Sequence, residues 1–377
     1  MKVRFLLLFL LLPILGLAQT YTYSTFARLP ANSKNKKINS STGFLTPDGA
    51  GNLYGYCEWG LYGCIFKVTS NAVLSTVFDF GSRSTFDCFP EGALILDSAG
   101  NFYGELDTAS LIDGEFFKVT PSGQETTEWI SPQSNLPFHP YLFLDSAGNL
   151  FGYDTEGSSP NGISNALFQI SSSGTHTLLY TFCQQTNCTD GEFPAGGPIV
   201  NGADGNIYGV AALGGQFGQG VVFRVTPDGQ YTVLYNFTGG SDGGEPEDRL
   251  TPDRAGNMYG TAFSGGANGG GGVVFKITTA GVFTVLHSFC TTGCPYDPAG
   301  PVVLDGSGNL YGTTSGGGSR NGGVVYKITS AGIFETIFNA ASNQIGKNIV
   351  FDKSGNLYGV TVGAGRVNAA VFKLTKH

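Results

Sequence analysis

The stretch Gly308–Gly312 reads GNLYG, and six other segments of the chain repeat it with little change. GNLYG recurs at 51–55 and 355–359, and the variants GNFYG, GNLFG, GNIYG and GNMYG start at residues 100, 148, 205 and 256. The intervals between successive starts are 49, 48, 57, 51, 52 and 47 residues. A period in this range is typical of solenoids, propellers and other repeat arrays.

One period contains four extended segments and none with helical spacing. From Pro301 the chain reads PVVLD, the turn GSGN, LYGTT, a Gly-rich loop, VVYKIT, the turn SAG and IFETIF. Short runs of β-branched and aromatic residues, separated by Gly, Asn and Ser, indicate strands. The other periods agree, with third segments such as IFKVT (65–69), VFRVT (222–226) and VFKLT (371–375). Four antiparallel strands in about 50 residues form one blade of a β-propeller.

The two chain ends distinguish an open array from a closed ring. The last repeat stops at VFKLTKH (371–377) and lacks a fourth strand. The segment TYTYSTF (20–26) resembles the fourth strands TLLYTF and TVLYNF of other repeats. We therefore predict an all-β fold, a seven-bladed β-propeller of four-stranded antiparallel blades, in which residues 20–26 complete the blade built from Asn348–Thr375. Closure of this kind removes open sheet edges, which template aggregation.

Turn chemistry explains the repeated pentapeptide within the pattern D-x-x-G-N-[LIFM]-[YF]-G. The Gly-Asn pair supplies the positive φ needed between the first and second strands. The Asp carboxylate can cap this turn. Leu and Tyr point to opposite faces of the blade, and both faces are buried when blades stack. We expect the final Gly to leave room for an aromatic ring from an adjacent strand or blade.

The N-terminus is typical of an export signal, with a basic start, an apolar run (5–15) and small residues before position 19. We predict a signal peptide over residues 1–18, one propeller domain over residues 19–377, and a secreted or periplasmic location. Removal of the signal leaves 18 basic against 28 acidic residues, which argues against nucleic acid as a partner. No later stretch is long and apolar enough to span a membrane, and we expect a monomer.

Six of the seven cysteines fall into close pairs, Cys57/Cys64, Cys183/Cys188 and Cys290/Cys294. None of the pairs has the C-x-x-C spacing of a structural zinc site. Local disulfides fit an oxidising compartment, so we predict these three bonds. Cys88 is left over, either as a free thiol or as an alternative partner of Cys57 or Cys64.

The repeat resembles the Gloeo/Verruco, or GloVer, repeat of secreted bacterial proteins. The matching elements are GNLYGT, a Gly-rich loop, V-F-K-[VIL]-T-x-x-G and T-V-L-Y-x-F, and they cover essentially the whole mature chain. The last five copies match best, whereas Gly55–Trp59 and GELD (104–107) depart from the Gly-rich pattern. The resemblance implies an extracellular repeat protein without an assigned reaction, and it supplies no catalytic residues.

If the strands run from axis to rim, two kinds of loop share one face of the ring. They join the second strand to the third, and one blade's fourth strand to the next blade's first. These loops are long and variable and carry all seven cysteines, so we take this face as the candidate binding surface. The candidate ligand-binding residues on it are Trp59, Tyr62, Glu91, His139, Asp190, Asp242, Tyr296 and Asp297.

Each candidate has a structural alternative. Trp59 and Tyr62 suit sugar stacking or a protein hot spot, or they pack locally. The acids suit a cation or sugar hydroxyls at the channel mouth, or they are ordinary solvated loop residues. His139 precedes a first strand near the axis, where a lone His is often structural. We predict no metal site, no cofactor and no catalytic set, because the chain has only four His and no convergent triad.

Two functions remain open. The first is a non-catalytic binding or structural module that engages an extracellular glycan or protein through the disulfide-bearing face. The second is a polysaccharide hydrolase or lyase that uses acids such as Glu91, Asp190 and Asp242 at the channel mouth. A glycosidase needs two carboxyl groups roughly 5–10 Å apart, and a sequence cannot show that distance.

Overall fold

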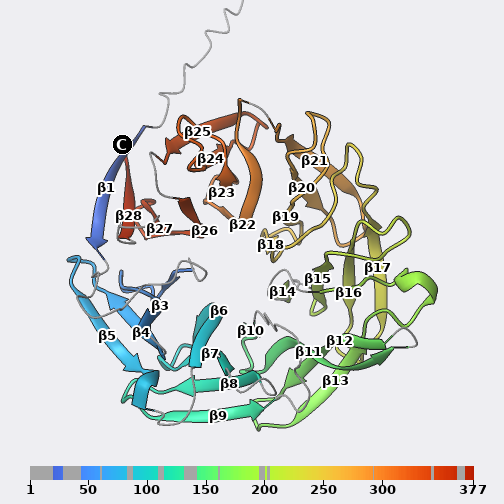
Figure 1. Cartoon of the computed structure of the whole chain (residues 1–377), viewed down its shortest axis with the longest axis horizontal. Coiled ribbons are helices and arrows are strands. Elements are labelled where there is room, and N and C mark those ends of the chain that lie inside the picture. The colour runs from blue at the N-terminus through green and yellow to red at the C-terminus, as the bar shows by residue number, and fades with distance from the viewer. Residues whose placement is uncertain are drawn as a thin grey trace, which may run out of the picture.

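The protein is a closed ring of seven four-stranded antiparallel blades (Figure 1). The computed structural model describes residues 20–28, 44–59, 62–82, 88–108, 114–130, 142–159, 162–194, 200–201, 204–291, 293–340, 344–362 and 370–377. The predicted signal peptide lies outside these ranges. No helix within them is long and apolar enough to cross a membrane.

Each blade contains one strand of each of four kinds, and the innermost are often short. The first strands are β2 (Thr46–Pro47), β6 (Cys88–Leu96), β10 (Phe143–Leu144), β14 (Val200–Asn201), β18 (Thr251–Pro252), β22 (Tyr296–Leu304) and β26 (Gln344–Phe351). The second strands are β3 (Leu53–Trp59), β7 (Phe102–Thr108), β11 (Leu150–Ser159), β15 (Ile207–Ala211), β19 (Met258–Ala262), β23 (Leu310–Gly316) and β27 (Leu357–Val362).

The outer half of each blade is more regular. The third strands are β4 (Tyr62–Val68), β8 (Gly114–Val119), β12 (Gly162–Ile170), β16 (Val221–Val225), β20 (Val273–Ile277), β24 (Val324–Ile328) and β28 (Ala370–Lys376). The fourth strands are β5 (Leu74–Asp79), β9 (Glu125–Ile130), β13 (His176–Thr181), β17 (Tyr231–Asn236), β21 (Phe283–Ser288), β25 (Phe334–Asn339) and β1 (Tyr21–Arg28). Two short 3-10 turns, Phe80–Ser82 and Thr186–Cys188, are the helical elements of the described residues.

Blades are numbered 1 to 7 from β2–β5 to β26–β28 with β1. Strand order within each blade follows the chain, and the fourth strands lie on the rim (Figure 1). Blades 1 and 2 are also joined by a parallel bridge between Tyr62 and Cys88. The axis-to-rim order assumed from the sequence is therefore confirmed.

The predicted closure by the N-terminal strand is confirmed. β1 pairs antiparallel with β28, from Tyr21 opposite Lys376 to Arg28 opposite Ala370, and so extends two residues beyond the predicted end. The register shifts between Thr25 and Ala27. The six other pairs of third and fourth strands have a register shift at the corresponding place, so β1 copies even the bulge of a fourth strand.

The hydrophobic core is divided among the seven seams between neighbouring blades. Each of the seven buried clusters combines side chains from two successive blades, such as Tyr208 and Val222 of blade 4 with Leu250 and Phe275 of blade 5. The seam between blades 7 and 1 contains Ala27 of β1. Every blade therefore needs both neighbours to bury its faces, which explains why the ring must close.

The final glycine of the pentapeptide makes room for a ring, as expected from the sequence. A Cβ atom on Gly209 would lie 2.5 Å from the Phe223 ring, and one on Gly260 would lie 2.5 Å from Phe275. The other five copies meet the third-strand ring of their own blade in the same way: Phe66, Phe117, Phe168, Tyr326 and Phe372. The invariant spacing thus reflects close packing within one blade.

The turn aspartates cap their turns as predicted. In blade 5, Asp253 Oδ1 accepts hydrogen bonds from the Ala255 and Asn257 amides, and Oδ2 accepts from the Asn257 side chain (2.7 Å) and the Tyr259 hydroxyl (3.1 Å). Burial acts to raise the pKa of Asp253, but these hydrogen bonds outweigh it and hold the pKa below its usual range. The sequence did not reveal that the pentapeptide tyrosine returns to the same carboxylate.

Candidate functional site

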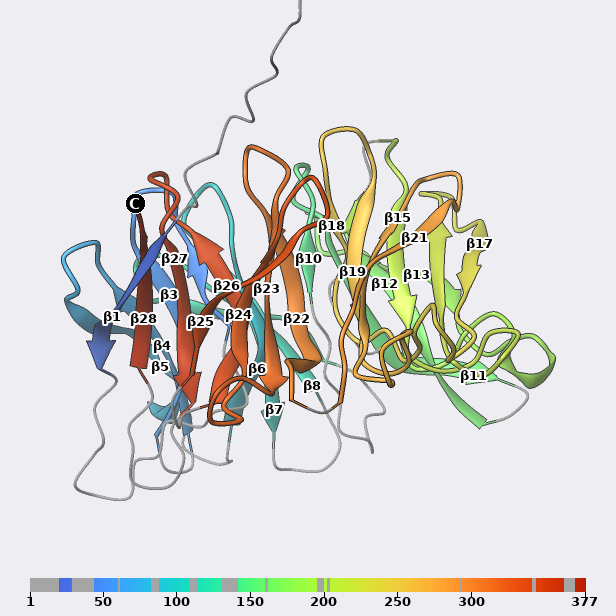
Figure 2. The same cartoon turned by 90° about the horizontal axis from the view of Figure 1, so that it is seen from above.

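The two kinds of loop interlock on one face of the ring, which points downwards in Figure 2. The loop entering blade 5 bonds to loops of both blade 4 and blade 5: the Glu245 amide donates to the Gln219 carbonyl (2.9 Å), and Gly244 pairs with Ser264. The loop entering blade 4 pairs with blade 4 through Glu192 and Leu213. These backbone bonds fix the loops entering blades 4 and 5 against the loops beside them.

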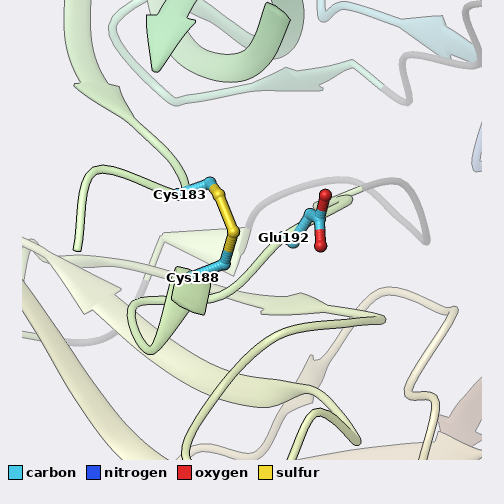
Figure 3. A group of neighbouring side chains, drawn as sticks. All are labelled: Cys183, Cys188 and Glu192. Carbon is cyan, nitrogen blue, oxygen red and sulfur yellow. A yellow bond between two sulfur atoms is a disulfide. The ribbon is translucent and has the colours of Figure 1, made fainter. Parts of the chain in front are cut away.

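All three predicted disulfides are present. Cys57 and Cys64 lie opposite each other across β3 and β4, whereas Cys183–Cys188 and Cys290–Cys294 close short loops after β13 and β21. Cys88 begins β6 beside Tyr62 and is outside these three bonds. Figure 3 shows the Cys183–Cys188 bond with Glu192 beside it.

Asp190 and Asp242 occupy equivalent places and hold their loops together. Asp190 has no exposed surface, and its carboxylate accepts hydrogen bonds from the Tyr180 hydroxyl (2.7 Å) and the Gln184 amide (2.9 Å). Asp242 accepts from the Tyr235 hydroxyl (2.9 Å) and from Thr238. Asp190 therefore offers no atom to a ligand from solvent in this conformation.

Tyr296 and Asp297 begin β22 and are both half-buried. The Tyr296 hydroxyl donates to Asn321 Oδ1 (2.8 Å), and the ring covers Gly316, where a Cβ atom would lie 2.1 Å away. Burial raises the pKa of the Asp297 carboxyl. Tyr296 is thus part of the loop framework of blade 6.

Three successive loops share a backbone feature that the sequence reading missed. Phe193, Glu245 and Asp297 each precede a proline and have φ values of 53°, 54° and 54°. This left-handed conformation is uncommon for residues other than glycine, and such strain often marks binding sites. The X-Pro dipeptide that recurs near the entry to each of these blades is the sequence signal that could have identified this set.

Exposed apolar side chains gather on the same loops. Phe193, Leu213, Phe217 and Phe263 are exposed by 47%, 38%, 52% and 39%, and we call them the apolar loop patch. Their backbones are fixed: the Ala212 amide donates to the Phe193 carbonyl (2.9 Å), and the Phe263 amide to the Glu245 carbonyl (3.1 Å). Loop burial is decided by neighbouring loops, so the sequence alone gave no reason to select these residues.

The remaining candidates are less fully described. Trp59 ends β3, Tyr62 begins β4 opposite it, and Glu91 of β6 lies opposite Glu105 of β7. The side chains of Trp59, Tyr62 and Glu91, and the whole of His139, lie outside the described part of the structure. Their roles stay predictions.

His287 fills a packing position, the one that Tyr180 and Tyr235 hold in blades 3 and 4. Its ring stacks on Phe334 of the next blade with centroids 4.0 Å apart, as Tyr235 stacks on Phe283 at 3.9 Å. Burial lowers the pKa of His287, so the neutral ring is favoured.

The sequence patterns did not identify Asp248, a buried acid near the axis. Asp248, only 8% exposed, accepts a hydrogen bond from the Gly300 amide of blade 6 (2.7 Å). Burial raises the pKa of Asp248 to about 7, although Lys347, the Gly300 amide and Arg249 act against this and Glu247 adds to it. Asp248 and Gly300 are 52 residues apart, so no local pattern could predict this contact.

Replacing Asp248 by Asn is expected to make stability less dependent on pH. A folded-state pKa raised above the unfolded value means that wild type loses stability as pH rises from about 4 to above 7. Asn keeps an acceptor for the Gly300 amide but cannot ionise. Urea unfolding should show the variant gaining roughly 1–3 kcal/mol on wild type between pH 5 and 8.

Asp253→Asn is the matched control, because the pKa of Asp253 is held low instead. Its variant should be less stable than wild type near neutral pH and approach wild type only in acid. A constant difference between Asp248→Asn and wild type across this range would show that Asp248 is ionised in the folded protein.

The C-terminal blades match a known sequence repeat. Residues 194–377 match the Gloeobacter/Verrucomicrobia repeat. The repeat is therefore shown for this C-terminal part of the chain. The match covers blades 4 to 7, which contain three of the four side chains of the apolar loop patch. A search of curated proteins found no match.

Solved structures resemble this repeat protein in fold only. A prolyl endopeptidase aligns with 90% of this chain and 50% of its own length, at a TM-score of 0.57 and 10% identity, so this chain spans half of it. A protein from Lactobacillus plantarum aligns with 83% of this chain and 87% of its own length, at a TM-score of 0.52 and 14% identity. A candidate gluconolactonase aligns with 95% of this chain and 92% of its own length at 13% identity. Its TM-score of 0.44 is too low to support an inference.

Proposed function

We propose that this chain is an exported, non-catalytic binding module that engages glycan through its disulfide-bearing loop face. The apolar loop patch carries the proposal, because three phenylalanine rings are 39–52% exposed on loops that hydrogen bonds hold in place. Rigid aromatic side chains provide contact area at low cost in conformational entropy. Fixed rings of this kind suit the apolar faces of sugars.

Polar groups beside the patch favour glycan over protein as the partner. Glu245 and Asp297 repeat the position of Phe193 in the next two blades, and both are partly exposed. Carboxylates accept hydrogen bonds from hydroxyl groups, whereas rings contact C–H surfaces. A row with one ring and two acids matches the mixed surface of a sugar chain better than a uniformly apolar protein hot spot.

Export is the second part of the proposal. Three disulfides are compatible with an oxidising compartment outside the cytoplasm. The basic and apolar N-terminal sequence supports removal of residues 1–18. These two features support a secreted or periplasmic location.

Replacing exposed rings should weaken glycan binding without changing the fold. We expect Phe217→Ser and Phe263→Ser each to lower affinity about tenfold for a polysaccharide selected on a glycan array, measured by calorimetry, because each removes one stacking surface. The matched controls are Val282→Ser and Ile333→Ser, which are exposed by 63% and 59% on turns of the opposite face.

Equal losses in the patch and control variants would contradict the assignment of the binding face. A protein from the same environment that binds the patch while every polysaccharide fails would replace glycan with protein as the partner.

One observation favours a polysaccharide hydrolase or lyase as a second candidate. Asp248, with its pKa raised to about 7, is adjacent to Glu247, and perturbed acids often mark catalytic sites. Release of reducing ends that Asp248→Asn abolishes would support the enzyme. If Glu91→Gln abolished the release of reducing ends, that result would support a catalytic role for Glu91 on β6.

A further inference from the structure

The Cys183–Cys188 loop brings a third potential ligand beside its two sulfur atoms (Figure 3). One atom from each side chain, the two Sγ atoms and a carboxylate oxygen of Glu192, all lie within 4.8 Å of one another. Within the described part of the chain, no other group of three His, Cys, Asp or Glu side chains comes this close. As long as the disulfide is intact, the sulfur atoms are bonded to each other and cannot act as thiolate ligands.

The loop does not depend on the disulfide alone for its shape. The Cys183 amide donates to the Gly191 carbonyl (3.1 Å), and the Cys188 carbonyl accepts from the Gly191 and Gly215 amides (2.8 and 2.9 Å). The buried Asp190 carboxylate adds bonds from Tyr180 and the Gln184 amide. Reduction would therefore leave both cysteines on a loop that is still braced from several sides.

Glu192 is positioned from the other side. Its amide donates to the Leu213 carbonyl (2.8 Å), and its carbonyl accepts from the Leu213 amide (3.0 Å). Both hydrogen bonds join Glu192 to the loop that follows β15 in blade 4, so they do not depend on the disulfide. The backbones that carry all three donors are thus held near one another by hydrogen bonds that do not involve the disulfide, and a metal site requires such preorganisation.

We propose that reduction of Cys183–Cys188 turns this loop into a site for Zn²⁺ or a similar thiophilic metal, with two thiolates and the Glu192 carboxylate as ligands. A dithiol supplies two electrons and two protons and is itself oxidised to a disulfide, and Cys183 and Cys188 become thiols. Metal binding then releases the two thiol protons. Tetrahedral zinc, with Zn–S of about 2.3 Å, needs the sulfurs roughly 3.7 Å apart, so the two side chains must turn apart once the disulfide between them is broken.

Three protein ligands leave one position of a tetrahedral ion open to water or to a ligand. The site is distinct from the apolar loop patch in its chemistry and does not depend on glycan binding. It would respond to the redox state of the surroundings, because the oxidised loop lacks the thiolates.

The Cys290–Cys294 loop supplies the matched control within the same chain. It is also a short disulfide loop on the same face, with a sequence separation of 4 against 5. Among the described residues it has no third donor side chain within the same distance. Two variants of the mature chain should be compared: one keeps only Cys183 and Cys188, the other keeps only Cys290 and Cys294, and serine replaces the other cysteines.

The probe is Co²⁺, titrated without oxygen after reduction by a phosphine, with Zn²⁺ competition. We expect the Cys183/Cys188 variant to bind one Co²⁺, with thiolate charge-transfer absorption, at least tenfold more tightly than the control variant. Adding Glu192→Gln should weaken binding about tenfold. Equal affinities in the two variants, or no effect of Glu192→Gln, would overturn the proposal.

A second measurement uses the wild-type chain, in case the multiple variants do not fold. After reduction, Zn²⁺ should protect Cys183 and Cys188 from alkylation, mapped by mass spectrometry, and leave Cys290 and Cys294 as reactive as without metal. Loss of the β-sheet circular dichroism on reduction alone, or equal protection of both loops, would also overturn it.

Discussion

A chain of residues 29–377, which lacks β1, is expected to unfold at much lower urea concentration than a chain of residues 20–377, or to aggregate. Deletion removes β1, which pairs with β28 along seven residue pairs. At 0.2–1 kcal/mol for each cross-strand pair, together with lost packing, we expect a loss of about 3–5 kcal/mol, a large part of a typical total of 5–15 kcal/mol. Urea titration followed by circular dichroism and gel filtration measures both outcomes.

The loss has two further structural causes. Ala27 is buried in the seam between blades 7 and 1, and the Phe26 ring packs edge-on against Tyr358 with centroids 5.1 Å apart. The Tyr23 ring stacks on Phe338 of blade 6 at 4.6 Å. Deletion would open the seam and leave β28 as an exposed edge, which favours aggregation.

A circular permutant is the matched control. The His377 amide already donates to the Thr20 carbonyl (3.0 Å), so the C-terminus lies where a hairpin into β1 would begin. A chain that starts at residue 29 and continues from His377 through a Ser-Ala-Gly turn into residues 20–28 should regain most of the lost stability. If the deletion variant unfolds at the wild-type urea concentration with the same m-value, β1 does not close the ring in solution.

Gly300→Ala is expected to be among the most damaging single substitutions in the chain. A Cβ atom at Gly300 would lie 1.3 Å from the Lys347 carbonyl oxygen of blade 7, and its φ of +77° disfavours every side chain. Backbone cannot move aside as a flexible side chain can, so the inner strands of blades 6 and 7 would have to separate. Overpacking and left-handed strain together indicate a loss of about 3–5 kcal/mol in the free energy of unfolding.

Separation of these strands would also break the bond between the Gly300 amide and Asp248. Gly306→Ala, in the turn that follows β22, is the control, because nothing lies within 4 Å of a Cβ atom there. It should stay within about 0.5 kcal/mol of wild type, or gain slightly from lower chain entropy. Similar urea midpoints for the two variants would show that blades 6 and 7 are less tightly packed than the geometry indicates.

The sequence alone determined the ring. Strand number, blade number, closure by the N-terminal segment, the turn geometry around Gly308 and the three disulfides all rest on residues close together in the chain or on a repeat of similar length. Period-two strands and Gly-Asn turns are local signals, so seven copies of each make the prediction secure. The close approach of Gly260 to the Phe275 ring was predictable for the same reason, since both belong to one blade.

Tertiary structure alone decided what each loop residue can do. Asp190 and Asp248 look like ordinary loop acids in the sequence, yet both are buried by contacts that the fold creates. The Asp248 carboxylate meets an amide 52 residues away, and the Asn348 side chain meets the Leu45 backbone 303 residues away. The burial and the pKa of these side chains depend on which blades become neighbours. The sequence around each residue does not specify those contacts.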